Sequence, residues 1–176
     1  CQNVTVQLDA NGAASITTND IDNGSTDACG IASLSLSQTA FDCDDLGSNS
    51  VTLTVTDNNG NSSTCTASVL VQDNTNPAIA GMPSDIVLVA ERNDCDPIVT
   101  WTLPSASDNC TVSSFSSDRQ SGEEYGVGTH TITYTAIDQS NNTTTASFTI
   151  TIQPDPLEVQ SLTAYEYNGG WNISCY

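Results

Sequence analysis

The sequence is 176 residues long and carries 21 acidic residues against two basic ones, so its formal net charge is −19. Such a chain lacks the basic surface that nucleic acids and anionic membranes require, which excludes both as partners and leaves divalent cations as the natural small ligands. Seven cysteines favour an oxidising compartment outside the cytoplasm, and no apolar run approaches the roughly 20 residues of a membrane-spanning helix.

Short runs of alternating apolar residues, separated by turns about every ten residues, predict an all-β fold. Helical periodicity is absent from every segment. About 80 residues of this pattern favour an immunoglobulin-like β-sandwich. In the first half we expect a hairpin of Val4–Leu8 and Ala14–Ile16, a strand at Ile31–Leu36, another at Val51–Val55, and a last strand that ends at Val69–Val71.

Two stretches of the chain, 54–69 and 135–150, are near copies of each other at an offset of 81 residues. Each consists of two alternating runs around a turn rich in Asp, Asn and Ser, which is the signature of a β-hairpin. The same offset places Cys29 on Cys110 and Gly47 on Gly128. Several matches at one offset indicate two copies of a single module.

The second copy and its boundaries follow from this repeat. Its expected strands are Ile86–Val89, Ile98–Trp101, Val112–Phe115, Thr131–Ala136 and Thr145–Ile152. A short polar linker, Asp73–Pro77, joins the copies. We therefore predict one module at 1–76, a second at 77–153 and the start of a third β module at 154–176, arranged as a rod of tandem immunoglobulin-like sandwiches stapled by disulfides. The chain starts with a strand pattern rather than a signal peptide, and we expect it to be a window of a longer secreted polypeptide.

Comparison of the two copies suggests how the cysteines pair. The positions equivalent to Cys1 and Cys65 hold Met82 and Ala146 in the second copy. Since the loss of one bonded cysteine would leave a free thiol, the joint absence of both predicts a Cys1–Cys65 bond.

The remaining cysteines are then assigned within each copy. We predict that Cys29 bonds Cys43, that Cys95 bonds Cys110, and that the partner of Cys175 lies beyond the end of the sequence. The Cys-x-x-Cys spacing of metal-thiolate and redox sites does not occur. All of these bonds are therefore expected to be structural.

The sequence does not contain a recognisable pattern of catalytic residues. The single histidine, His130, lies where a predicted strand begins, and a lone imidazole in a strand is a surface residue far more often than a general base. Glu123 and Glu124 are adjacent and would face opposite sides of a strand, unlike a glycosidase acid–base pair. We predict that the chain is not an enzyme.

Calcium is the one ligand that the sequence supports on physical grounds. Asp20, Asp22 and Asp27 place carboxylates around Gly24 in one loop, as a loop that wraps a hard cation requires. Two further candidate sites are the hairpin turn at Asp57 and the linker at Asp73, each with asparagines nearby. The alternative is that these residues only form turns through local side-chain hydrogen bonds.

The second copy resembles a known family. It resembles the HYR (hyalin repeat) domain, an immunoglobulin-like extracellular adhesion module, at Gly81–Pro83, Cys95–Trp101, Asp108–Cys110, Gly126–Thr129 and Thr133–Asp138. Met82 and Ala146 depart from the family pattern, in which cysteines occupy both positions. The first copy resembles the divergent HYR-like repeats of very large bacterial surface proteins.

The tail resembles the start of an SprB-type repeat, at Pro156–Leu157 and Asn172–Cys175. The combination is similar to the giant surface adhesins of gliding bacteria that are exported by type 9 secretion. This resemblance implies a non-catalytic stalk or filament segment at the cell surface, with neighbouring modules of the same polypeptide, surface glycans or other filament subunits as partners. The alternative is an accessory spacer or carbohydrate-binding region of a secreted enzyme, which would use aromatic platforms such as Trp101 or Trp171.

Overall fold

The computed structural model of the chain describes residues 1–91 and 95–156, which form two compact units. Unit 1 consists of Cys1–Pro77 and two short segments of the second repeat, Asp108–Val112 and Asp138–Asn142. Unit 2 consists of Ala78–Ser107, Ser113–Ile137 and the described residues from Thr143 on. Both units are all-β and immunoglobulin-like, as the periodicity of the sequence predicts.

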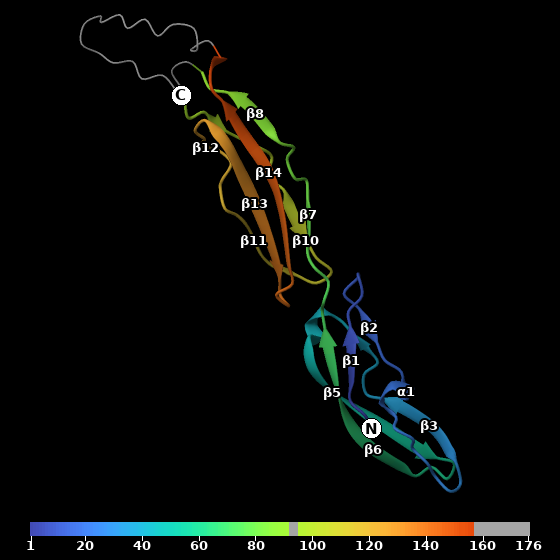
Figure 1. Cartoon of the computed structure of the whole chain (residues 1–176). Helices are drawn as coiled ribbons and strands as arrows, with labels where there is room; N and C mark the ends of the chain where they lie inside the picture. The colour runs from blue at the N-terminus through green and yellow to red at the C-terminus, as the bar shows by residue number, and fades with distance from the viewer. Residues whose placement is uncertain (92–94, 157–176) are drawn as a thin grey trace, which may run out of the picture. The chain divides into compact units, whose positions relative to one another are not determined.

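Unit 1 is built on a four-stranded sheet in the order β1-β6-β5-β3 (Figure 1). The long strands β5 (Gly47–Asp57) and β6 (Ser62–Gln72) form an antiparallel hairpin, so the hairpin predicted at 54–69 is confirmed. Strand β3 (Ile31–Leu36) pairs antiparallel with β5, and β1 (Val4–Gln7) pairs parallel with β6.

A second, two-stranded sheet pairs β2 (Ala14–Ser15) with β4 (Ala40–Phe41). The predicted hairpin of 4–8 with 14–16 is therefore wrong. Its two strands do not pair with each other, because the turn between them carries the chain from the four-stranded sheet to the two-stranded one. Alternation alone identifies strands but does not say which strand is the partner.

Two short helical turns occur within the described residues of this all-β fold, although no segment of the sequence shows helical periodicity. Helix α1 (Thr18–Ile21) occupies the Asp20 loop, and a 3₁₀ turn, η1 (Cys43–Asp45), follows β4. One helical turn is too short to show a 3.6-residue period in the sequence. Ile21 at its end is fully buried, which anchors the loop to the core.

The core of unit 1 lies between the two sheets and comes from alternate residues of the long hairpin. Val51 and Leu53 of β5 and Val69 of β6 are 0 % exposed. They pack with Phe41 of β4 and other apolar side chains of the first repeat. Complete burial of each such side chain stabilises the fold by about 1.5–3 kcal/mol.

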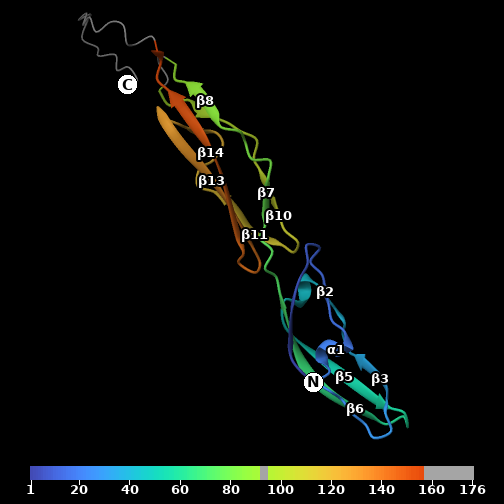
Figure 2. The ribbon, with the colours of Figure 1, turned by 45° about the vertical axis from the view of Figure 1, so that its right-hand side comes forward.

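Unit 2 repeats the arrangement with a four-stranded sheet in the order β11-β13-β14-β8. Its strands are β8 (Ile86–Val89), β11 (Val112–Ser117), β13 (Gly128–Asp138) and β14 (Thr143–Gln153). Strands β13 and β14 form the antiparallel hairpin expected from the repeat, and β8 lies parallel to β14 on its other side (Figure 2).

Two short strand pairs complete unit 2. Strand β7 (Ala78–Ala80) pairs with β10 (Ser105–Ser107), and β9 (Ile98–Val99) pairs with β12 (Glu123–Glu124). The half-buried Trp101 packs into this core with its ring edge-on to Phe148, and its indole N–H donates to the Tyr134 hydroxyl at 2.8 Å. The predicted third module lies, from residue 157 on, outside the described residues.

The disulfides agree with the sequence prediction at one pair and correct it at two. Cys1 is bonded to Cys65, which joins the residues before β1 to β6. The other bond joins Cys43 to Cys110, so the predicted pairs Cys29–Cys43 and Cys95–Cys110 are wrong. The prediction confined each bond to one repeat, whereas residues 108–112 of the second repeat belong to unit 1 and lie against Cys43.

The remaining cysteines have different states. Cys29 carries an exposed free thiol, and Cys95 takes part in a disulfide. Cys175 lies outside the described residues, so the prediction about its partner stays a prediction.

Candidate metal centre

Three aspartates from distant parts of the sequence meet in unit 1. Asp73 directly follows β6, Asp108 directly follows β10, and Asp138 is the last residue of β13. One carboxylate oxygen from each residue lies within 4.8 Å of those of the other two. Asp73 is 4 % exposed and Asp138 is 1 % exposed, while Asp108 is half-buried.

Hydrogen bonds hold one side of the Asp73 and Asp108 carboxylates. Asp73 Oδ1 accepts from the backbone N–H of Thr75 at 3.0 Å and from the Asn109 side-chain amide at 3.2 Å. Asp108 Oδ2 accepts from the backbone N–H of Cys110 at 3.1 Å. The second oxygen of each carboxylate, Asp73 Oδ2 and Asp108 Oδ1, is buried and has no hydrogen-bond partner.

Asn142 and Asn109 connect the three segments. The side chain of Asn142 donates to Asp138 Oδ2 at 2.7 Å and to the Asp73 carbonyl oxygen at 3.0 Å, and its backbone N–H donates to Asp138 Oδ1. The side chain of Asn109 donates to the Asp9 carbonyl oxygen as well as to Asp73. Its own Oδ1 is a third buried oxygen without a partner.

Of the five aspartates that the sequence offered as calcium ligands, Asp73 alone belongs to this centre. Within residues 1–91 and 95–156, no other group of three His, Cys, Asp or Glu side chains comes this close together. Asp108 and Asp138 were not predicted as ligands, because they lie far from Asp73 in the sequence and no single contiguous loop contains them. The repeat did contain a signal for them, because Asp108 and Asp138 lie 81 residues after Asp27 and Asp57 and so occupy equivalent positions in the two copies.

The other predicted ligands are engaged in local turns instead. Asp20 accepts from the backbone N–H and the hydroxyl of Thr17 at the start of α1, and these bonds lower the pKa of Asp20. Asp22 accepts from the hydroxyl and backbone N–H of Ser25, which lowers its pKa in the same way. Asp27 accepts from the backbone N–H of Cys29. These contacts favour the turn-forming alternative for the Asp20 loop.

Asp57 caps the turn of the first hairpin. It accepts from the side-chain amide of Asn61 and the backbone N–H groups of Asn61 and Asn59, all at 2.8 Å. The side-chain amide of Asn61 makes the largest contribution to lowering the pKa of Asp57, followed by the backbone N–H of the same residue. Both oxygens are therefore satisfied within the turn.

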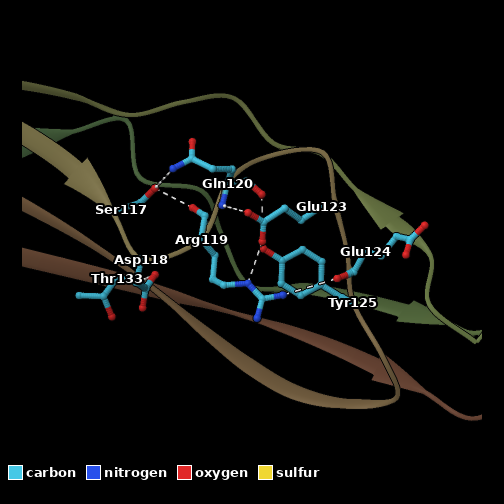
Figure 3. Close-up of polar contacts among 8 residues, drawn as sticks. All are labelled: Ser117, Asp118, Arg119, Gln120, Glu123, Glu124, Tyr125 and Thr133. Atoms are coloured by element: carbon cyan, nitrogen blue, oxygen red, sulfur yellow. Dashed lines mark hydrogen bonds and ion pairs between the residues drawn. The ribbon is translucent and has the colours of Figure 1, made fainter.

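A second polar cluster, in unit 2, surrounds Arg119 (Figure 3). Arg119 Nε donates to Glu123 Oε2 at 2.8 Å, and the guanidinium lies over the Tyr125 ring, 4.7 Å from its centroid. The Glu123 hydrogen bond raises the pKa of Arg119, and burial raises the pKa of Tyr125. The cluster orders the β11–β12 connection, and its partially exposed ion pair contributes little to stability.

Within residues 1–91 and 95–156, neither His130 nor the hollow beside β5 and β6 matches a catalytic arrangement. His130 Nε2 lies 2.8 Å from the Gly126 carbonyl oxygen, and its ring is edge-on to Tyr125. The hollow beside β5 and β6 is lined by Ser25, Thr26, Val55, Ser63, Thr64 and Cys65. None of these side chains is a general acid or base.

Comparison with known proteins finds a family match over the second repeat. Residues 72–152 match the HYR domain. The second repeat is a HYR-like module with the immunoglobulin fold. The chain is also 32 % identical over 158 residues to hyalin of Strongylocentrotus purpuratus, a match that covers 86 % of this chain and 13 % of hyalin. The chain thus spans a small part of that relative.

Solved structures with a similar strand arrangement are more distant. The first four cadherin domains of protocadherin gamma B7 match 88 % of this chain and 49 % of that chain at 14 % identity and a TM-score of 0.34. The fibronectin(III)-like modules of Clostridium thermocellum CbhA match 95 % and 96 % at 15 % identity and a TM-score of 0.32. At these scores the likenesses do not bear on ligands or partners.

Proposed function

We propose that the chain is a non-catalytic, load-bearing stalk segment of a large extracellular adhesion protein built from repeats. The proposal is supported by two successive copies of one module, the second of which is HYR-like. The described part of the chain contains no helix with the length and hydropathy of a membrane span. The cysteines and the acidic surface fit an oxidising location outside the cell.

The main support for the proposal is a short covalent path, formed by two disulfides, that joins the start of the first repeat to a residue beyond the linker. Cys1 is bonded to Cys65, and Cys43 of the first repeat is bonded to Cys110 of the second. The shortest covalent path from Cys1 to Cys110 therefore passes through the 43–65 segment alone. Because a pulling force follows this path, most of residues 1–110 cannot be drawn out while both bonds persist.

Single-molecule stretching of the 176-residue chain, tethered at its two ends, tests this role. We expect the oxidised chain to release little length from the first repeat. Breaking the Cys1–Cys65 and Cys43–Cys110 bonds should free the whole 1–110 segment, a gain of about 300 Å in extended length, in addition to whatever the reduction of the Cys95 disulfide releases. Equal extended lengths in the oxidised and reduced chains would contradict a load-bearing function.

The alternative role, a carbohydrate-binding region of a secreted enzyme, requires exposed aromatic platforms. Trp101 is half-buried and hydrogen-bonded to Tyr134, which does not favour a platform at that position. Trp171 lies outside the described residues. Titration of the chain with a panel of glycans, followed by tryptophan fluorescence, distinguishes the roles: a saturable shift supports sugar binding, and constant spectra support the stalk.

The finer part of the proposal is an adhesin filament of a gliding bacterium, exported by type 9 secretion. It is supported by the resemblance of the tail to an SprB-type repeat, most of which lies outside the described residues. Its expected partners are neighbouring modules, surface glycans and other filament subunits. Further repeats of about 80 residues in the full-length protein would support it, and their absence would contradict it.

A further inference from the structure

We propose that Asp73, Asp108 and Asp138 bind a calcium ion, with Asn109 as a fourth oxygen ligand. This site does not depend on the stalk role. It differs from the single-loop sites that the sequence suggested, because its carboxylates come from three segments of unit 1. The three carboxylate oxygens lie within 4.8 Å of one another.

The charge of the cluster requires compensation. Three carboxylates at this separation repel one another, and burial strengthens the repulsion because water no longer screens it. Among the described residues Arg119 is the only lysine or arginine, and it is paired with Glu123 in unit 2. A bound divalent cation neutralises the cluster without any basic side chain.

The unpartnered oxygens indicate where the ion lies. Asp73 is 96 % buried, yet its Oδ2 has no hydrogen-bond partner, and the same holds for the buried atoms Asp108 Oδ1 and Asn109 Oδ1. A buried polar atom without a partner costs about 1–3 kcal/mol, and three such atoms in one cluster are unusual in a native fold. Coordination to one cation satisfies all three oxygens.

The surrounding hydrogen bonds orient these ligands. Thr75 and Asn109 hold one oxygen of Asp73, and the backbone N–H of Cys110 holds one oxygen of Asp108. In each carboxylate the other oxygen remains available. The Cys43–Cys110 disulfide fixes the chain immediately after Asn109. Such outer contacts are what position the ligands of metal sites in proteins.

The donor atoms and their spacing select calcium. All candidate ligands are oxygens, with no imidazole or thiolate in the group, which favours a hard cation. Two oxygens on opposite sides of Ca²⁺ are about 4.6–5.2 Å apart, so oxygens within 4.8 Å of one another fit around one ion. Water molecules would complete the six to eight ligands that Ca²⁺ takes.

Calorimetric and thermal titration of the 176-residue chain tests the site. After removal of divalent ions with a chelator, we expect Ca²⁺ to bind with one ion per chain and to raise the Tm of unit 1 by at least about 5 °C at hundred-fold excess over the dissociation constant. Asp73→Asn and Asp108→Asn each keep an oxygen for the existing hydrogen bonds and should abolish both effects. Circular dichroism checks that these variants remain folded.

The repeat supplies matched controls. Asp27 and Asp57 are equivalent to Asp108 and Asp138 at the 81-residue offset but are not part of the cluster. Asp27→Asn and Asp57→Asn should therefore bind Ca²⁺ like the wild-type chain. The proposal is overturned if Ca²⁺ up to about 10 mM gives no heat of binding and no change in the Tm. This concentration is above the dissociation constants of extracellular calcium modules. Loss of binding in the two control variants, with binding kept in Asp73→Asn, would equally overturn it.

Discussion

Cys43 and Cys110 are joined by a disulfide although 67 residues separate them in the sequence. The sulfur of Cys43 lies 3.8 Å from the Gly12 carbonyl oxygen and 3.7 Å from that of Asn109. The bond therefore sits where the turn after β1, the start of η1 and the 108–112 segment come together. It also fixes the backbone beside Asp108 and Asn109 of the candidate metal centre.

Removal of this bond should destabilise unit 1. We expect the double variant Cys43→Ala/Cys110→Ala to lower the free energy of unfolding by about 4 kcal/mol, because the closed loop of the unfolded chain is lost. Urea unfolding of the oxidised chain, with and without the substitutions, measures the difference. A change of less than about 1 kcal/mol would contradict the bond.

Cys29 provides the control for the pairing. Because its thiol is free and exposed, iodoacetamide should label Cys29 in the folded, non-reduced chain, and Cys29→Ala should leave the free energy of unfolding within about 0.5 kcal/mol of wild type. Peptide mapping locates the label. An unlabelled Cys29, recovered in a disulfide-linked peptide with Cys43, would restore the pairing expected from the repeat.

Gly12 packs against the same junction and should not tolerate a side chain. Its φ of +73° lies in the left-handed region, and a Cβ would stand 2.7 Å from both the Asn109 carbonyl oxygen and the Cys43 sulfur. We expect Gly12→Ala to cost more than 2 kcal/mol, since strain at positive φ costs about 1 kcal/mol and the clash adds to it. Thermal unfolding measures the loss.

Gly24→Ala is the matched variant for this prediction. Gly24 has a similar φ of +81°, but a Cβ there would meet no atom within 4 Å. The variant should therefore show the backbone cost alone, about 1 kcal/mol. If the two substitutions lower the stability equally, the close approach of Gly12 to Asn109 adds nothing to the cost of Gly12→Ala.

The long strands were predictable because their side-chain pattern is local. Val51 and Leu53 alternate with polar residues along β5 and are completely buried, and the Asp57 turn resembles that of the second copy. The 81-residue offset then transfers the hairpin to β13 and β14. Short strands such as β7 and β12 were missed because two or three residues carry no measurable period.

The repeat comparison fails where the copies differ by one residue. Val4 of β1 pairs with Val69, and Ile86 of β8 pairs with Ile150. Val69 and Ile150 are 81 residues apart, but Val4 and Ile86 are 82 apart, so the first strand has slipped by one position relative to the constant offset. The residue equivalent to Cys1 in space is therefore Pro83 rather than Met82. This slip does not change the inferred Cys1–Cys65 pair, since neither Met82 nor Pro83 is a cysteine.

The metal centre could not be derived from single loops because its parts meet only in the folded chain. Asp73 comes from the linker, and Asp108 and Asp138 come from segments that pack into unit 1. Hydrogen bonds from Asn109 and Asn142 to Asp73 span 36 and 69 residues. Contacts this far apart leave no periodic trace in a sequence.

The hairpin turn of the first repeat should respond to acid through Asp57. Its pKa is lowered by Asn61, so the turn contributes stability above the unfolded pKa of about 4 and loses it as the pH falls through the lower folded pKa. We expect the wild-type chain to lose stability more steeply below pH 4 than Asp57→Asn, which does not titrate. Urea unfolding at several pH values tests this, and an NMR titration giving Asp57 a pKa above 4 would contradict it.

The hydrogen bond between Trp101 and Tyr134 should stabilise unit 2. Tyr134 is 4 % exposed, and its hydroxyl is the acceptor for the indole N–H at 2.8 Å. Tyr134→Phe removes the acceptor, and because Trp101 is only half-buried its N–H can regain some water, so we expect a loss of about 1 kcal/mol. A double-mutant cycle with Trp101→Phe isolates the pair, with an expected coupling of about 1 kcal/mol by urea unfolding. Additive effects of the two substitutions would contradict a stabilising bond between the Tyr134 hydroxyl and the indole, since Tyr134→Phe keeps the ring that stacks on Phe115.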